Sequence, residues 1–422
     1  MLSVDLVLVV LAGTLLALVL ISRVTKRMSL SPVLLALIVG VLVGPEALGV
    51  LDLTGQLPRH VLLEQVTRIA LALLVADIGL RTRPADLRDN AARLLVLLAL
   101  VMPAMWLLTG LGAELMFGLP FAVALVLGAA LTPTDPGVSS TITTGTLANR
   151  SLPRRLRMSL QVESGANDGL AVPFVILSGL LATRPDGPAV AEWARSAGRE
   201  VGIALILGPL IGFLAAQLLR FAERERAVAE TYLPLLGPAT AVATLAAAHL
   251  AHGTGVLAAF LAGLVLSLTL PEEDLREPIS AFHASASRVA LIAVFLTFGT
   301  VLPLGGWADL GAAGVLFAGW VVFLRRLPAA VPLLRATGTG WRSALFLSWF
   351  GPLGVAAIYY LAYLHRYALP EYERLFAAGT LAIVVSVVAA ALTSTPAVLA
   401  YRWGARSEVP EGEHSQLPGP LP

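Results

Sequence analysis

The stretch that decides the fold is residues 158–183, which read MSLQVESGANDGLAVPFVILSGLLAT. It is long and apolar enough to cross a membrane, yet its first half carries Glu163, Asn167 and Asp168. Burying an ionisable group in hydrocarbon costs free energy, so such groups usually have a charged or polar partner or a function. The stretch therefore predicts a membrane helix that forms part of an ion site.

The composition of the whole chain is that of a polytopic membrane protein. Of its 422 residues, 57% are hydrophobic and 13% are charged, whereas soluble domains carry about 25% charged residues. The mean hydropathy is +0.83, and the net charge of +2 gives no reason to expect a nucleic-acid partner. The chain has no cysteine, which excludes disulfides, thiolate metal sites and cysteine nucleophiles.

Apolar runs of membrane-spanning length recur from end to end, so we expect an all-α fold of about thirteen transmembrane helices. The tail from 403 to 422 is rich in Pro and Glu, and we expect it to be a short disordered segment in the cytoplasm. The predicted spans are 4–22, 32–50, 61–80, 92–113, 120–147, 158–183, 200–221, 232–250, 253–270, 287–304, 308–326, 342–364 and 374–402.

The distribution of basic residues predicts the orientation. The first span has no basic residue before it, so we expect a retained helix with its N-terminus outside, not a cleaved signal peptide. With that start, 22 of the 29 lysine and arginine residues fall in the cytoplasmic links and tail. We therefore expect a multi-pass protein of the inner (plasma) membrane with a cytoplasmic C-terminus.

Two of the predicted spans are interrupted at matching places. The fifth contains Pro133 and Asp135-Pro136-Gly137, and the twelfth contains Gly351-Pro352-Leu353-Gly354. Each is the middle one of three consecutive spans, a pattern typical of inverted repeats whose broken helices cross at a transporter's binding site. Proline and glycine are also simply common in membrane helices, but paired breaks, one beside an acid, favour the site.

Spacing along the sixth span separates its two acids. Ser164 and Asp168 are four residues apart and share a helical face, whereas Glu163 lies about 140° round the helix from Asp168. Together with Thr134 and Asp135 from the opened fifth span, that face predicts an oxygen-rich cation site, and such oxygens suit hard monovalent cations. One carboxylate there can hold a proton or a cation, but not both. No cofactor is expected.

Glu163 needs a different explanation from Asp168. Arg325 or Arg326, at the end of the eleventh span, would pair with it and keep it charged. The alternative is that both arginines are membrane-surface anchors of the kind that basic residues form beside many spans.

Three motifs in order carry a family resemblance: Thr134-Asp135-Pro136, then Glu163-Ser164-x-x-Asn167-Asp168, then an arginine at the eleventh span. The combination resembles the sodium/proton exchanger branch of the monovalent cation–proton antiporters, of the bacterial type. The resemblance covers roughly residues 1–402. It implies sodium transport and pH homeostasis through a homodimer. It further implies a moving core of about 92–183 and 308–402, and a dimerisation scaffold of about 1–80 and 200–304, with the third span's place uncertain.

The same resemblance implies roles for individual residues. Asp168 would carry the cation and the proton, and Asn167 beside it is associated with electroneutral exchange. Monovalent-cation contacts would come from Asp168 and Asp135, helped by Thr134 and Ser164, with Asn167 as support and with Glu163 paired to Arg326.

The late break departs from the family pattern. Relatives usually read G-x-R-G there, and this chain has Leu353 in place of the arginine. Arg342 is a candidate substitute for the missing charge.

Two other functions compete with antiport. One is an uncoupled ion channel or a sensor on the same scaffold, motivated by the missing arginine at 353. The other is an intramembrane hydrolase built on Ser164 and Asp168, which lacks any evident histidine partner, so we do not expect an enzyme. The choice among Na⁺, K⁺ and Li⁺, the pH optimum and the direction of transport stay open.

Overall fold

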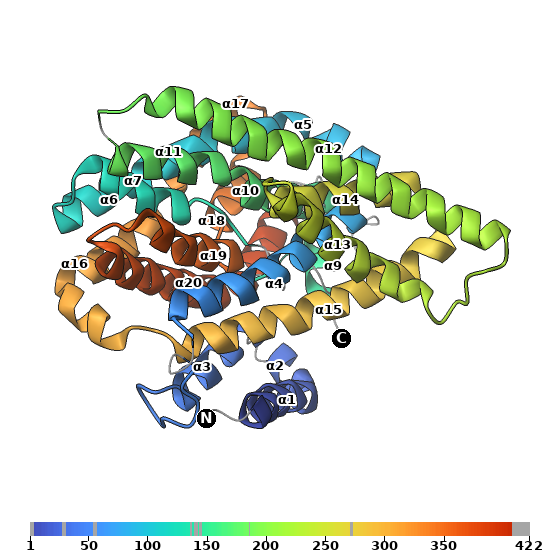
Figure 1. Ribbon diagram of the computed structural model, residues 1–422, viewed down its shortest axis with the longest axis horizontal. Helices are drawn as coiled ribbons and strands as arrows, with labels where there is room; N and C mark the ends of the chain where they lie inside the picture. Colours follow the sequence, from blue (N-terminus) through green and yellow to red (C-terminus); the bar gives the residue numbers. More distant parts are fainter. Residues whose placement is uncertain are drawn as a thin grey trace.

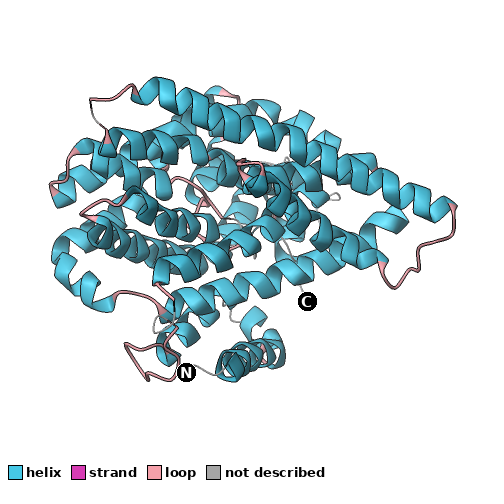
Figure 2. Cartoon of the chain, viewed as in Figure 1, coloured by secondary structure: helices cyan, strands magenta, loops and turns pink. Residues whose placement is uncertain are grey.

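The computed structural model describes residues 4–27, 31–53, 57–135, 137, 138, 142, 146–184, 186–270 and 273–406. Within these ranges the chain forms helices joined by loops, with no strand (Figure 2). Seven helical stretches there are long and apolar enough to cross a membrane, and four shorter apolar helices accompany them. The prediction of an all-α membrane protein is therefore confirmed, whereas the count of thirteen spans is not established.

One group of helices packs around α14 and α15 (Figure 1). In it α14 packs on α12, α13 and α4, and α15 packs on α3 and α4. Small residues allow close approach, since a Cβ on Gly40 of α3 would lie 2.2 Å from the Leu296 carbonyl oxygen of α15. The members are α1 (Val4–Leu20), α2 (Ser22–Arg27), α3 (Pro32–Val43), α4 (Arg59–Arg81), α12 (Ala189–Arg224), η2 (Leu233–Leu235), α13 (Leu236–Leu250), α14 (Gly255–Thr269) and α15 (Glu273–Thr300).

A second group contains the two broken helices. In it α7 packs on α6, α11 and α19, and α16 packs on α6 and α20. Its earlier members are α5 (Pro84–Val96), the π-helical η1 (Leu97–Val101), α6 (Met102–Phe117), α7 (Phe121–Ala130), α9 (Thr146–Ser151), α10 (Arg154–Leu170) and α11 (Val172–Thr183). Its later members are α16 (Leu304–Phe323), α17 (Leu327–Ala336), α18 (Trp341–Trp349), α19 (Val355–Tyr363), η3 (Leu364–Tyr367) and α20 (Tyr372–Arg406).

The two predicted interruptions are present as non-helical backbone and they touch each other. Helix α7 ends at Ala130, and residues 131–135 continue without helical structure. Helix α18 ends at Trp349, and α19 begins at Val355. The Asp135 N–H donates to the Pro352 carbonyl at 2.8 Å, so the breaks cross at one point. Pro136, part of the predicted signal, lies outside the described residues.

Several boundaries differ from the sequence prediction. Helix α3 ends at Val43, before the predicted 50, because Gly44 and Pro45 open a turn. The predicted link after the eleventh span contains α17, whose start follows the buried Arg326. Helix α20 continues to Arg406, beyond the predicted end at 402, so residues 403–406 are helical rather than part of a disordered tail; residues 407–422 lie outside the described part.

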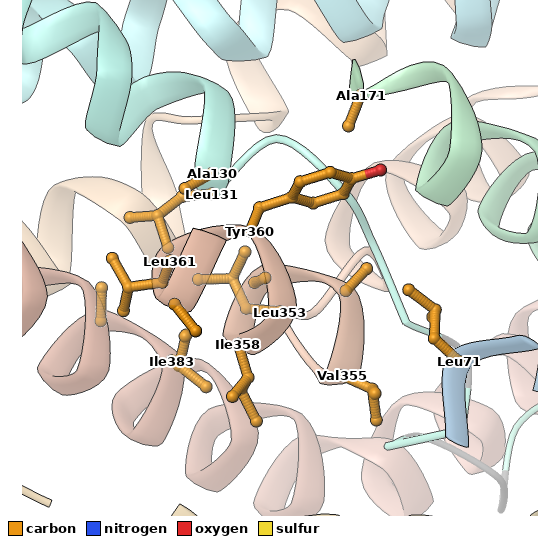
Figure 3. Packing of buried hydrophobic residues seen from close by; sticks show 14 of the residues in the cluster. Leu71, Ala130, Leu131, Ala171, Leu353, Val355, Ile358, Tyr360, Leu361 and Ile383 are labelled. Atoms are coloured by element: carbon orange, nitrogen blue, oxygen red, sulfur yellow. The ribbon is translucent and has the colours of Figure 1, made fainter. Parts of the chain in front are cut away.

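An apolar core to which both groups contribute surrounds the crossing (Figure 3). Leu353, Val355, Ile358 and Leu361 contribute to it from the break and α19, and Leu131 contributes from the end of α7. The crossing is therefore sealed by packed side chains, and its polar groups must find partners among themselves.

Candidate functional site

Helix α10 carries its polar residues into the protein interior. Glu163, Ser164, Asn167 and Asp168 are all buried, at 3% exposure or less. The helix packs on α4 and α14 of the first group and on α5 and α18 of the second. A helix covered on all sides explains how charged and amide side chains are kept at membrane depth.

Glu163 and Arg326 form a buried, two-point ion pair. The Arg326 Nη1 donates to Glu163 Oε1 at 2.7 Å, and Nη2 donates to Oε2 at 2.8 Å. Arg326 Nη2 also donates to the Leu347 carbonyl of α18 at 3.1 Å. Paired forks of this kind are stronger and more directional than single contacts. The pair therefore ties α10 to the start of α17 and to α18.

Asn167 connects this ion pair to the fifth-span break. Its Nδ2 donates to Glu163 Oε1 at 3.2 Å and to Thr134 Oγ1 at 2.8 Å, and its Oδ1 accepts from the Thr134 N–H at 3.2 Å. The hydroxyls of Thr134 and Ser164 are hydrogen bonded at 2.9 Å. The structure thus brings Thr134, Ser164, Asn167 and Glu163 into one network, in which the asparagine serves as both donor and acceptor.

Asp135 meets the start of α19. Its Oδ2 accepts from the Val355 N–H at 2.9 Å, and its Oδ1 accepts from the Gly137 N–H at 2.7 Å. A carboxylate at a helix N-terminus satisfies an orphan donor and complements the positive end of the helix dipole. A Cβ on Gly354 would lie 2.2 Å from Asp135 Oδ2, so only glycine leaves room for this approach.

Asp168 is arranged differently from the other two acids. Its Oδ1 is buried and has no hydrogen-bond partner in the part of the chain that the structure describes. Its backbone carbonyl accepts from the Tyr360 hydroxyl, and the carboxylates of Asp135 and Glu163 lie near enough to interact with it electrostatically. Buried polar atoms normally have partners, so this oxygen points to a role other than structural support.

A cavity of about 480 Å³ approaches Asp168 from one side. It lies between the two helix groups, lined from α4, α12, α13 and α14 on one side and from α11, α19 and η3 on the other. Tyr360 lines this cavity and also donates to the Asp168 backbone carbonyl, so one side chain connects the cavity wall to the residue that carries the acid.

Some site contacts were not expected from the sequence. Of the two arginines considered for Glu163, Arg326 makes the pair, whereas Arg325 is also buried and donates to backbone carbonyls at both breaks. Tyr360 and Ser386, which accepts from the Leu353 N–H at 3.0 Å, carry no motif that sequence reasoning could use. Arg342 lies exposed at the start of α18, so it is not placed at the break.

A model of the transmembrane family described as "Sodium/hydrogen exchanger, transmembrane" matches residues 12–400. The chain belongs to the sodium/hydrogen exchanger family. The match includes both breaks, α10 and the arginines that follow α16. Proteins of this family are transporters, so the hydrolase alternative is set aside.

Relatives in the sodium/hydrogen exchanger family are named for two cations. The chain is 29% identical over 358 residues to Na(+)/H(+) antiporter 2 of Zygosaccharomyces rouxii, covering 80% of this chain but only 43% of that protein. It is 29% identical over 369 residues to the Na(+)/H(+) antiporter of Schizosaccharomyces pombe, covering 82% and 76%. It is 27% identical over 394 residues to the K(+)/H(+) antiporter NhaP of Alkalimonas amylolytica, covering 92% and 65%.

The fold also matches solved exchanger structures. A structure of the sodium proton antiporter MjNhaP1 from Methanocaldococcus jannaschii at pH 8 superposes with a TM-score of 0.73 at 18% identity, covering 92% of this chain and all of that one. An electron-microscopy structure of the same protein gives a TM-score of 0.78, again at 18% identity, with 94% and 98% covered. This likeness establishes the fold of the family for the chain.

Proposed function

We propose that this protein is a monovalent cation/proton antiporter that exchanges the two ions at Asp168. The observation that carries the proposal is the buried Asp168 carboxylate beside a crossing of two broken helices, whose Oδ1 has no hydrogen-bond partner among the residues that the structure describes. Family membership and the names of the relatives, which include both Na⁺/H⁺ and K⁺/H⁺ antiporters, support it.

Exchange follows from competition for one carboxylate. A proton on Asp168 neutralises it, and a bound Na⁺ or K⁺ does the same, so the two cargoes exclude each other. Hydroxyl oxygens of Thr134 and Ser164 lie in the connected network and are proposed to complete the cation's oxygen ligands. Asp135 has both carboxylate oxygens engaged by backbone N–H groups, so its proposed contribution is mainly its charge.

One exchanging carboxylate also sets the stoichiometry that we propose. Glu163 is held by Arg326, and position 167 is an amide, so Asp168 is the acid of α10 left to change state. One proton is then replaced by one monovalent cation, and the exchange is electroneutral.

Transport requires that the site face each side in turn. We propose that the group containing α6, α7, α10, α11 and α16–α20 moves against the group containing α3, α4 and α12–α15, and that the protein works as a homodimer. The cavity between the groups, with Tyr360 in its wall, is consistent with access from one side. The proposed setting is the inner membrane, with the N-terminus outside and the C-terminus in the cytoplasm.

The direct test measures coupled exchange in proteoliposomes. A ΔpH-reporting dye should show dissipation of an imposed pH gradient when Na⁺ or K⁺ is added, and Asp168→Asn should abolish it. Asp309→Asn is the matched control, because Asp309 is an exposed acid of α16 outside the site. If the Asp168→Asn protein still dissipates ΔpH on cation addition, the proposal is wrong.

A channel or sensor on the same scaffold predicts a different result. It would pass current in a planar bilayer, or bind ions without moving protons. Saturable, cation-dependent proton movement without single-channel currents supports antiport, whereas currents without coupling would replace it.

A further inference from the structure

Arg325 is a buried guanidinium without an ion pair among the described residues. Its side chain is 3% exposed, and the carboxylate of Glu163 is paired with the neighbouring Arg326. An isolated buried charge is costly unless other groups replace the water that it gives up. The partners of Arg325 therefore indicate why the sequence keeps two arginines in a row.

Those partners are carbonyl oxygens at the ends of two different helices. The Arg325 Nη1 donates to the Leu131 carbonyl at 2.6 Å, directly after α7 ends. Its Nη2 donates to the Gly351 carbonyl, two residues after α18 ends. The last carbonyls of a helix lack partners within it and carry the negative end of its dipole. One guanidinium thus serves both negative ends at the crossing.

The crossing therefore has a complementary set of charges. Asp135 lies at the positive start of α19, and Arg325 lies at the negative ends of α7 and α18. The break between α18 and α19 supplies no cation, because its residues 351–354 are Gly, Pro, Leu and Gly. Leu353 is fully buried in the apolar core (Figure 3). Arg342, at the exposed start of α18, lies a helix length away from the break.

We propose that Arg325 is the positioning residue of the crossing in this chain, supplying from outside the break the charge that position 353 lacks. Its fork of donors holds the end of α7 and the end of α18 in one geometry. That geometry places Thr134 and Asp135 beside α10 and its Asp168. The inference rests on the proposed antiport for its transport readout, but not for its stability readout.

The central experiment is a double-mutant cycle between positions 325 and 353. Arg325→Met should raise the KM for the cation roughly tenfold in correctly folded protein and lower Tm, because both carbonyls lose a charged donor. Leu353→Arg should lower Tm in the parent, because it adds a second buried cation. In the Arg325→Met background the same Leu353→Arg change should raise Tm and bring the KM back toward the parent value.

Two further variants test whether the two-pronged contact of Arg325 with the helix ends is needed. They distinguish that contact from the effect of its charge alone and from the general effect of losing an arginine. Arg325→Lys keeps the charge but loses the planar fork, so its KM should stay high. Arg342→Met removes a nearby exposed arginine and should leave the KM and the Leu353→Arg effect unchanged. A parent-like KM in folded Arg325→Met protein, or an equally harmful Leu353→Arg in both backgrounds, would overturn the proposal.

The two readouts distinguish this inference from the proposed function. If the parent protein shows no exchange at all, antiport fails, and the Tm cycle alone decides the role of Arg325. If the parent exchanges ions normally and Leu353→Arg lowers Tm by the same amount in both backgrounds, antiport stands and the Arg325 inference fails.

Discussion

At the scale of single residues, the three buried acids near the crossing have separate surroundings. Glu163 is bound at two points by Arg326, and Asp135 accepts two backbone N–H groups. Asp168 has an oxygen with no hydrogen-bond partner in the described part of the chain. Two acids are thus held by protein partners, which leaves Asp168 as the acid that we propose takes and releases the cargo ion. The asparagine between them keeps Glu163 and Thr134 connected.

Breaking the Glu163–Arg326 pair should destabilise the protein strongly, even if the intact pair adds little net free energy of folding. Glu163→Gln or Arg326→Met leaves one buried charge uncompensated, and we expect each to cost about 3–5 kcal/mol. The double variant should lose less than the sum of the two, because no lone charge remains. Thermal unfolding in detergent measures this cycle. Additive losses would show that the two side chains do not depend on each other.

At the scale of helices, the crossing depends on close approach between the two breaks. Asp135 reaches the start of α19 only because position 354 has no side chain, since a Cβ there would lie 2.2 Å from its Oδ2. The short α18 and α19 each expose a helix end at this point, and charged groups from other elements satisfy those ends.

Gly354→Ala should therefore disrupt the crossing. We expect a loss of about 1–3 kcal/mol, the usual cost of overpacking, together with slower exchange. Gly319→Ala on α16 is the control, because a Cβ there meets no atom within 4 Å and should leave Tm unchanged or slightly higher. Thermal unfolding and ΔpH dissipation measure both effects. Equal behaviour of the two variants would contradict the proposed packing requirement.

At the scale of the whole molecule, α4 packs on α10 and α19 of the second group, and polar side chains join the two groups at one end of α4. The rings of His60 and His365 stack with centroids 3.5 Å apart, and Glu64 pairs with Arg366. If the two helix groups move against each other during transport, these contacts must break and re-form in each cycle.

Crosslinking across this boundary should stop transport. The chain has no native cysteine, so His60→Cys with His365→Cys introduces the only two thiols. We expect oxidation to reduce exchange to background and a reductant to restore it, with the single-cysteine variants unaffected by either treatment. Undiminished exchange by the crosslinked protein would place α4 in the same moving body as η3.

Sequence reasoning reached the fold class and the two breaks, and it named candidate site residues that the structure brings close together, because each had a local signal. Polar residues in apolar spans, matched Pro and Gly interruptions and the i, i+4 spacing of Ser164 and Asp168 are all readable without coordinates. Helix ends were less predictable, as α3, α17 and α20 show, because in a membrane protein packing and hydrogen bonding decide where an apolar helix stops.

The sequence by itself indicated a membrane exchanger and marked the acids on α10 and in the fifth-span break as candidates for its site, because burying charge in hydrocarbon is costly. Tertiary structure alone decided which arginine does what. Arg325 and Arg326 are adjacent and chemically identical, yet one meets Glu163 and the other meets the carbonyls of Leu131 and Gly351. Pairing across the fold depends on where distant helix ends come to lie, and no local pattern encodes that placement.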